Sequence, residues 1–165
     1  MVPWWQEVWN TVREEFSDLP NIAQVTRIGI RLLLACALGA VLGIEREEKR
    51  KAAGIRTHML VALGAAIFVA VPQQAGVSLP ELMRVLQGLL AGIGFLGAGC
   101  ILHKQDSTNV RGLTTAAGIW VTAAIGATAG LGRDSSAILA TVLAVVILTA
   151  VPKMPANESS DSKVT

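Results

Sequence analysis

The sequence predicts an all-α integral membrane protein, a bundle of five transmembrane helices preceded by an amphipathic interfacial helix. Hydrophobic residues make up 52% of the 165 residues and charged residues only 16%, whereas a soluble domain carries roughly 25% charged residues. The mean hydropathy of +0.54 points the same way. The chain also holds 16 glycines and no tyrosine, and small residues let membrane helices approach each other closely.

Composition also excludes several function classes. The net charge is only +2 and no long tract of one charge is present, so we expect no nucleic-acid partner. Cys36 and Cys100 lie in separate apolar runs, which predicts neither a disulfide framework nor a redox pair. No nucleophile accompanied by a base and an orienting group is recognisable, so we expect no enzymatic activity and no cofactor.

Residues 1–24 predict the amphipathic helix. Trp5, Trp9 and Phe16 recur at helical spacing, and Pro20 is expected to end the helix. Tryptophan side chains suit the headgroup layer of a membrane. Two interpretations stay open, a helix that lies in the membrane interface and a leader whose tryptophans pack on the protein. The segment lacks the basic and apolar regions of a removable signal peptide.

Five apolar runs predict the five spans of a membrane domain over residues 25–151. They are residues 25–44, 57–71, 85–102, 113–131 and 136–151. A hydrocarbon core of about 30 Å needs about 20 helical residues. The second and fifth runs are shorter than this, so each either draws flanking polar residues into the interface or is re-entrant.

Polar segments separate the runs. They cover residues 45–56, 72–83, 103–112 and 132–135. Thr57 and Asp134 are expected N-caps, and Gly132 is an expected helix stop. The tail, residues 152–165, is polar and contains proline, which predicts a disordered cytoplasmic segment.

The distribution of lysine and arginine predicts the orientation in the membrane. If the first and third polar segments and the tail share a side, that side holds nine basic residues, against three or four on the other. The nine are Arg46, Lys49, Arg50, Lys51, Arg56, Lys104, Arg111, Lys153 and Lys163. Cytoplasmic loops carry an excess of Lys and Arg, so we expect the N-terminus outside and the C-terminus in the cytoplasm.

Glycines spaced by four residues recur in three of the runs. The pairs are Gly39 with Gly43, Gly88 with Gly92, and Gly126 with Gly130. Each pair predicts a groove for close helix contact, either inside the bundle or between copies in a homo-oligomer. The third run also contains Gly94, Gly97 and Gly99. Their spacing imitates a dinucleotide-binding fingerprint, but no strand is predicted before them, so they predict a thin, closely packed helix.

Two arginines lie inside the first run. A charged side chain within a span is costly and usually has a partner or a function. Arg31 is the deeper of the two, one turn inside Arg27 on the same helix face. Glu81 or Asp134 could answer the charge of Arg31, or both arginines could reach the outer phosphates.

Polar side chains gather at the expected cytoplasmic helix ends and form a candidate binding site. They are Glu45, Arg46, Arg56, Thr57, His58, Thr114 and Thr115. The positive N-termini of two helices would point towards them. Together with the basic loop, this predicts an anionic partner, either lipid headgroups at the cytoplasmic face or an acidic protein surface.

A metal site competes with this interpretation. Zinc prefers the side-chain types found at Glu45, His58, Cys100 and His103. Their spacing matches no compact site, and interfacial polar residues also satisfy helix ends, so we expect no metal. The spans contain no acidic residue apart from Glu45 at the membrane edge, which disfavours a dedicated divalent-cation transporter.

Three ordered segments carry a family resemblance. They read GIEREEKRKAAGIRTHMLVALGAA, GIGFLGAGCIL and VRGLTTAAGIWVTAAIGATAGLG. These segments resemble the signatures of the MgtC/SapB family of bacterial inner-membrane proteins, and the likeness spans about residues 25–151. The matching motif residues are Glu45, Arg46, Gly54, Arg56, Thr57 and His58, then Gly92, Gly94, Phe95, Gly97 and Gly99, then Gly112, Leu113, Thr114, Thr115 and Trp120.

The resemblance implies a five-span domain in the bacterial inner membrane with its N-terminus outside. It also implies a link to magnesium limitation, acid stress and survival inside macrophages. The best-known member looks like a regulator that acts through other membrane proteins, including the proton-translocating ATP synthase, rather than a transporter. That member carries a soluble C-terminal domain, and we expect this chain to be a short form with the membrane domain only.

We therefore expect a non-enzymatic membrane protein that binds and modulates partner inner-membrane proteins and forms homo-oligomers through glycine-lined helix faces. The alternative is a transporter or channel for ions or small solutes. The residues along its route would be Arg31, Glu45, Arg56 and His58. A third hypothesis is a metal sensor built on the four candidate ligands named above.

Overall fold

The computed structural model describes residues 3–15, 21–102 and 112–151, which form helices joined by turns, with no strand among them. The helices are α1 (Trp4–Glu15), α2 (Ile22–Glu48), α3 (Ile55–Gln74), α4 (Leu79–Leu102), α5 (Leu113–Gly130) and α6 (Asp134–Ala150). The predicted all-α class is confirmed. The predicted disordered tail, residues 152–165, lies outside the described residues.

Four of the described helices, α2 to α5, are long and apolar enough to cross a membrane. The longest, α2, has 27 residues, which is about 40 Å at 1.5 Å per residue. The last helix, α6, is also apolar but has 17 residues, which is about 25 Å. The fifth span stays a prediction, because this helix is shorter than a hydrocarbon core of about 30 Å.

The second polar segment is shorter than predicted. α3 continues through Pro72 and ends two residues later. Proline lacks the N–H that donates within a helix, but so close to the helix end its effect is small. α4 begins before the predicted run and holds Pro80 in its first turn, where no N–H is needed. The predicted loop over residues 72–83 therefore shrinks to residues 75–78.

Two residues predicted as N-caps, Thr57 and Asp134, lie inside their helices instead. Gly54 is the N-cap of α3, so Thr57 lies inside the first turn of that helix. Asp134 is the first residue of α6, and Arg133 precedes it as the cap. Gly132 is the helix stop that its position after α5 predicts, because its φ of 74° suits glycine and turns the chain away from the helix.

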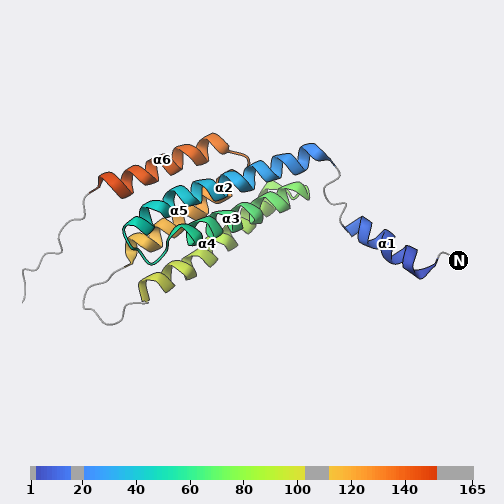
Figure 1. The fold of residues 1–165 in the computed structure, drawn as a ribbon, viewed down its shortest axis with the longest axis horizontal. Coiled ribbons are helices and arrows are strands. Elements are labelled where there is room, and N and C mark those ends of the chain that lie inside the picture. Colours follow the sequence, from blue (N-terminus) through green and yellow to red (C-terminus); the bar gives the residue numbers. More distant parts are fainter. Residues whose placement is uncertain (1–2, 16–20, 103–111, 152–165) are drawn as a thin grey trace, which may run out of the picture.

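Three helices form the centre of the bundle. α3 packs on both α2 and α5, and these two also contact each other. α4 lies against α3 and α5, and α6 lies against α2 and α5 (Figure 1). Neighbours alternate in direction, so α2, α4 and α6 end where α3 and α5 begin. We call this the Glu45 end, and the opposite one the Arg31 end.

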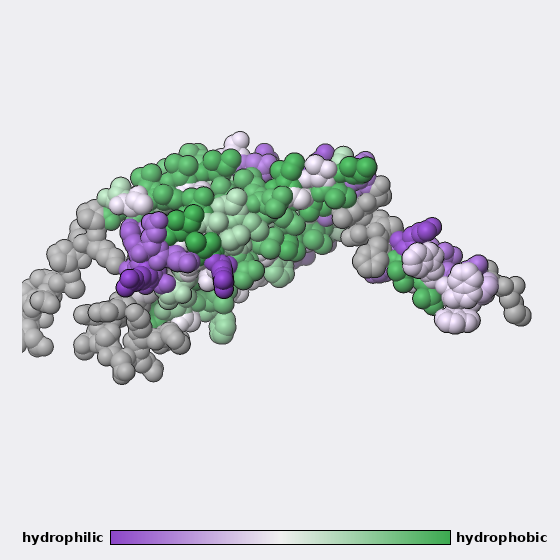
Figure 2. All heavy atoms as spheres, in the orientation of Figure 1, coloured by the Kyte–Doolittle hydropathy of each residue, from purple (hydrophilic) through white to green (hydrophobic). Residues whose placement is uncertain are grey.

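Hydrophobic side chains cover the outside of the bundle between its two ends. Figure 2 shows them along its length, with hydrophilic side chains gathered at the left-hand, Glu45 end. Large apolar side chains such as Leu33 and Phe95 are 72% and 81% exposed. Monomeric soluble proteins rarely expose contiguous apolar surface on this scale, so the exterior suits lipid.

The first helix, α1, stands apart from the bundle. It packs on none of the other described helices, and all of its residues are exposed. Trp4, Trp5 and Trp9 therefore do not pack on the described helices of the bundle, in contrast to the interpretation that they pack on the protein. Contact with the membrane interface stays a prediction. Phe16 lies outside the described residues.

Glycines hold the three central helices in close contact. A Cβ atom on Gly39 would lie 2.6 Å from the carbonyl oxygen of His58, and one on Gly126 would overlap the backbone of Ala62. The same contact recurs one turn along at Gly43 and Gly130. Two of the three predicted glycine pairs therefore pack inside the bundle, one between α2 and α3 and one between α5 and α3.

Alanines and medium-sized apolar side chains fill the rest of the core. One cluster joins α2, α3, α5 and α6, and a second joins α3, α4 and α5. Their buried members include Ala35, Leu38, Leu42, Ala62, Ala66, Ile125, Ala129 and Ala137 in the first, and Ala65, Val69, Leu82, Ile93, Ile119, Ala123 and Ala127 in the second. The core between the two ends is therefore apolar.

We expect Gly126→Val to destabilise the protein by about 1–3 kcal/mol, the usual cost of overpacking a core. Its added side chain would overlap Ala62. Gly64→Val is the control, since the Cβ position of Gly64 in α3 is surrounded by open space. Thermal unfolding in detergent should give a lower midpoint temperature for the first variant than for the second. Equal midpoints would show that α3 and α5 are not held at this distance.

Candidate functional site

Buried polar side chains lie at the Glu45 end. Glu45 and Arg46 are 7% and 3% exposed. The Nη1 atom of Arg46 lies 3.5 Å from Oε2 of Glu45, and Nη2 donates to the hydroxyl of Thr115 at 3.3 Å. A buried charge is tolerated when it is paired in this way. We call these residues, with Lys49 and His58, the Glu45 cluster.

Lys49 links the Glu45 cluster to α6. Its Nζ atom lies 2.5 Å from Oε1 of Glu45 and donates to the carbonyl oxygen of Leu148 at 2.9 Å. That carbonyl belongs to the last turn of α6, where carbonyl groups lack partners within the helix and a cation is favoured. Sequence spacing places Lys49 only in a basic loop and gives no sign of this link.

Glu47 satisfies the start of α3. Its Oε2 atom accepts a hydrogen bond from the N–H of Ile55 at 2.9 Å. The N-cap position is occupied by Gly54, which has no side chain to make this bond. A carboxylate at a helix N-terminus is also favoured by the helix dipole. Glu47 was missed at the sequence level, where the only signal is a helix start without a capping residue.

His58 lies in the first turn of α3 and is fully buried. Its Nδ1 atom is 2.9 Å from the carbonyl oxygen of Gly54, and a carbonyl only accepts, so Nδ1 carries a proton. Nε2 has no hydrogen-bond partner among the residues that the structure describes. His58 lines an apolar groove between α5 and α6. In a neutral imidazole with the proton on Nδ1, Nε2 is a hydrogen-bond acceptor.

The remaining predicted site residues lie outside the Glu45 cluster. Arg56, Thr57 and Thr114 belong to the first turns of α3 and α5 at the same end, but their side chains are exposed. The structure thus separates the Glu45 cluster, which joins the helices, from these three exposed side chains.

Arg31 lies at the opposite end and has neutral partners. Its Nη1 atom donates to Oε1 of Gln73 at 2.9 Å and to the carbonyl oxygen of Gly130 at 3.2 Å. The second acceptor lies at the end of α5, where a positive charge is favoured. A Cβ on Gly132 would overlap the guanidinium. Arg31 therefore ties α2 to α3 and to the turn after α5.

The two carboxylates expected to form an ion pair with Arg31 have other roles. Glu81 accepts hydrogen bonds from the hydroxyl of Ser78 at 2.6 Å and from its N–H at 3.1 Å, an arrangement typical of a helix start. Asp134 begins α6. Neutral acceptors thus replace the expected ion pair. Arg27 is exposed, so the prediction that it reaches phosphates stays open.

The candidate metal ligands do not form a site within the described part of the chain. No three His, Cys, Asp or Glu side chains there could hold a metal ion together. Glu45 is engaged in ion pairs, His58 bonds a carbonyl group, and Cys100 is half-buried in α4. The fourth candidate, His103, lies outside the described residues.

The glycines of α4 mostly face away from the bundle. Four of them, Gly88, Gly92, Gly94 and Gly99, have no atom of a neighbouring helix within 4 Å of the position of a Cβ. Gly97 differs, because its Cβ would make an ordinary contact of 3.6 Å with Ala116. The third predicted glycine pair, on α4, therefore does not pack inside the bundle.

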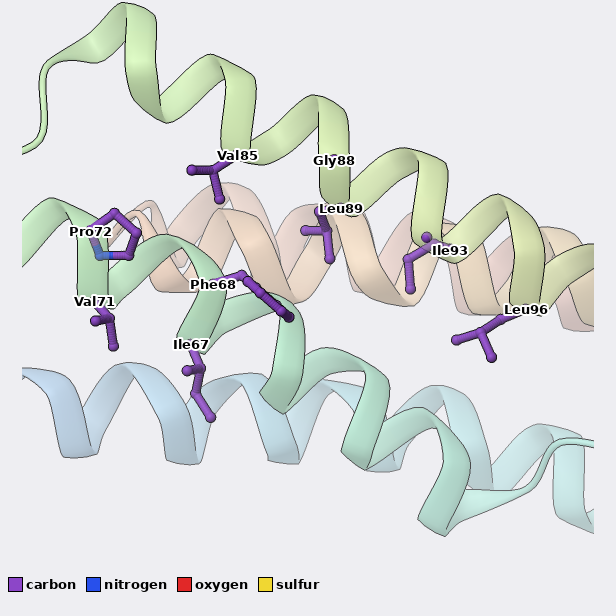
Figure 3. A pocket seen from close by; sticks show the side chains of 10 residues that line it. Ile67, Phe68, Val71, Pro72, Val85, Gly88, Leu89, Ile93 and Leu96 are labelled. Carbon is purple, nitrogen blue, oxygen red and sulfur yellow. The ribbon is translucent and has the colours of Figure 1, made fainter.

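An apolar groove of about 770 Å³ runs between α3 and α4. Figure 3 shows side chains of α4 on one side of it and side chains of α3 on the other, with Gly88 leaving a gap on α4. The labelled side chains are Ile67, Phe68, Val71, Pro72, Val85, Leu89, Ile93 and Leu96. Gly92 also lines the groove. The open helix face and the groove offer a surface for another helix.

Comparison with known proteins finds clear relatives. The MgtC family profile matches residues 32–156. The chain is 44% identical over 133 residues to "Protein SrpB" of Synechococcus elongatus, which covers 74% of this chain and 73% of that protein. It is 43% identical over 114 residues to "Protein MgtC" of Salmonella typhimurium. This match covers 69% of this chain and 48% of the Salmonella protein.

A further relative is "Putative magnesium transporter YhiD" of Escherichia coli, 39% identical over 126 residues, which cover 72% of this chain and 58% of that protein. The chain thus spans only about half the length of this relative and of the Salmonella protein. No solved structure matches the chain. The range matched by the family profile includes the Glu45 cluster and the groove between α3 and α4.

We expect Arg46→Met to lower the free energy of unfolding by about 3–5 kcal/mol, the cost of removing one partner of a buried ion pair. The hydroxyl of Thr115 would also lose its donor. Arg50→Met is the control, because Arg50 is exposed in the turn after α2. The midpoint temperatures of thermal unfolding in detergent are measured for both variants and for the wild type. A shift as small as that of the control would contradict a role of Arg46 in holding α2 on α5.

Proposed function

We propose a function from one premise: the chain belongs to the MgtC family. It is a bacterial membrane protein, and four of its described helices are long and apolar enough to cross a membrane. The proposal is that it binds other proteins of the inner membrane and modulates them, in support of growth when magnesium is limiting. No enzymatic activity is part of the proposal.

The observation that carries this proposal is the open groove between α3 and α4. It is apolar along its length and includes the exposed Gly88 and Gly92. Glycines at this spacing let a second helix approach the backbone closely. Phe95 on the same helix is 81% exposed and adds apolar surface. A transmembrane helix of a partner protein would fill such a groove.

The apolar interior favours binding over transport. The buried charged residues of the described chain, Glu45 and Arg46, lie at one end of the bundle. The buried hydroxyls of Thr122 and Thr141 donate to carbonyl groups of their own helices. The buried side chains between the two ends are apolar, and many of them are alanine. This interior gives a hydrated ion little to bind.

The link to magnesium rests on the relatives. One of them is named a putative magnesium transporter, and the family resemblance implies a role in magnesium limitation. Mg²⁺ takes oxygen ligands in octahedral geometry, typically with carboxylates. Glu45, the one buried carboxylate among the described residues, is already paired with basic side chains. We therefore propose that the chain acts on magnesium homeostasis indirectly, through its partners.

We further propose that the Glu45 end faces the cytoplasm. Its basic side chains would then follow the excess of Lys and Arg in cytoplasmic loops and meet anionic lipid headgroups. The same α4 face could also serve a second copy of the chain, so a homo-oligomer is part of the proposal.

We expect Gly92→Leu to abolish co-purification of partner membrane proteins, because its side chain would fill the groove. Gly94→Leu is the matched control, since Gly94 lies on the same helix in equally open space but does not line the groove. The readouts are mass spectrometry of the tagged protein purified in mild detergent and growth of cells at low magnesium. If both variants or neither lost the partner, the groove would not be the binding surface.

A second candidate function is a transporter or channel for ions or small solutes, which the name of the Escherichia coli relative favours. The residues proposed for its route do not lie together. Arg31 contacts the ends of α3 and α5, whereas Glu45 and His58 lie at the opposite end of the bundle. Arg56 is exposed. Flux of magnesium, monovalent ions and anions into proteoliposomes tests it. A flux that Glu45→Gln removes would favour transport over partner binding.

The proposed orientation predicts opposite labelling of two positions. In a chain with Cys36 and Cys100 replaced by alanine, Arg50→Cys should react with an impermeant maleimide only in opened membranes. Ser135→Cys should react in intact cells, because it lies near the Arg31 end. Both positions are exposed. Labelling of position 50 from outside would reverse the orientation.

A further inference from the structure

A basic cavity lies at the Glu45 end, between the end of α2, the start of α5 and the end of α6. Its volume is about 600 Å³. Arg46, Lys49 and Lys51 line it, and no carboxylate is among its described lining residues. Glu45 pairs with both Arg46 and Lys49, so one carboxylate faces two cations. The cavity therefore keeps a net positive charge and suits an anion.

An apolar groove of about 340 Å³ between α5 and α6 opens beside the basic cavity. The two share three lining residues, Thr114, Ile147 and Leu148, so they are continuous. Buried side chains of the central helices, Leu42 and His58, also line the groove and form its floor.

The groove follows the axis of the bundle. On α5 its lining runs from Thr114 to Val121, about 10 Å at 1.5 Å per residue. On α6 it runs back from Leu148 to Ala140. The basic cavity thus lies at the membrane edge, and the groove leads from it towards the membrane centre. A phospholipid has the same order, a charged phosphate at the surface and acyl chains below it.

Unused hydrogen-bonding capacity marks the basic cavity as a binding site. Arg46 lines it and is 3% exposed, yet its Nε atom has no hydrogen-bond partner among the described residues. α5, which has 18 residues, begins beside it after Gly112, which offers no side-chain cap. The first N–H groups of a helix and a guanidinium are both good partners for phosphate oxygens.

We propose that this composite site binds one anionic glycerophospholipid, with its phosphate in the basic cavity and one acyl chain in the groove between α5 and α6. The positive charge selects an anionic over a zwitterionic lipid. The apolar groove selects a lipid over a free phosphate. An apolar helix of a partner protein fits less well, because it would bring no negative charge to the net positive charge of Arg46, Lys49 and Glu45 at the mouth of the groove.

Native mass spectrometry tests this proposal on the full chain released from nanodiscs that hold phosphatidylglycerol and phosphatidylcholine with identical acyl chains. We expect the wild type to retain phosphatidylglycerol in preference. Lys51→Gln should weaken that retention about fivefold, the usual contribution of one lysine near an anionic lipid surface. Ala117→Leu should abolish it by filling the groove, because Ala117 is exposed and lines the groove.

Matched controls separate the site from general effects. Arg50→Gln is the control for Lys51→Gln, because it removes the neighbouring basic residue. Ala98→Leu is the control for Ala117→Leu. Both alanines are exposed, and each lies four residues from the terminus of its helix, α4 or α5, at the Glu45 end. Neither residue lines the site, so both variants should behave as the wild type.

Three results would overturn the proposal. One is equal retention of the two lipids by the wild type. Another is that the variants and the controls retain the same amount of phosphatidylglycerol, whether all of them retain less than the wild type or all retain as much. The third is a bound polypeptide in place of lipid that Ala117→Leu displaces. One variant changes the basic cavity and the other the apolar groove, so either one alone decides the matter if the other fails to fold.

Discussion

The distance from α3 to its two neighbours, α2 and α5, is the constraint on which the rest of the structure depends. Gly39 and Gly126 bring helix backbones into direct contact, where no side chain fits. With α2 and α5 both held on α3, the guanidinium of Arg46 can span from one to the other and reach Thr115. The buried ion pair therefore follows from the close packing, since helix spacing fixes how far a side chain must reach.

Long polar side chains then complete the helix ends. Lys49 donates to the last turn of α6, Glu47 accepts from the first turn of α3, and Arg31 donates to the last residue of α5. Near a membrane, water is scarce and each unpaired backbone group is costly. These three contacts bridge different helices, so the same bonds that satisfy the ends also fix how the helices are aligned.

Hydropathy predicted the helices well, because a membrane helix must stay apolar for about 20 residues. Glycine spacing predicted close contacts, but it could not tell that Gly88 faces outwards while Gly126 faces inwards, since spacing does not reveal which helix face meets the bundle. The partners of charged residues were least predictable. Arg31 meets Gln73 and a carbonyl group rather than a carboxylate, because folding brings these neutral acceptors within its reach.

The two kinds of glycine differ in what evolution can reveal. At Gly126 the backbone contact excludes every side chain, so natural selection for folding alone would preserve glycine. At Gly92 the surrounding space is open, and the fold tolerates replacement. Glycine retained at position 92 across lineages would therefore record selection by a binding partner. A lineage in which position 92 has drifted would be one that has lost or exchanged that partner.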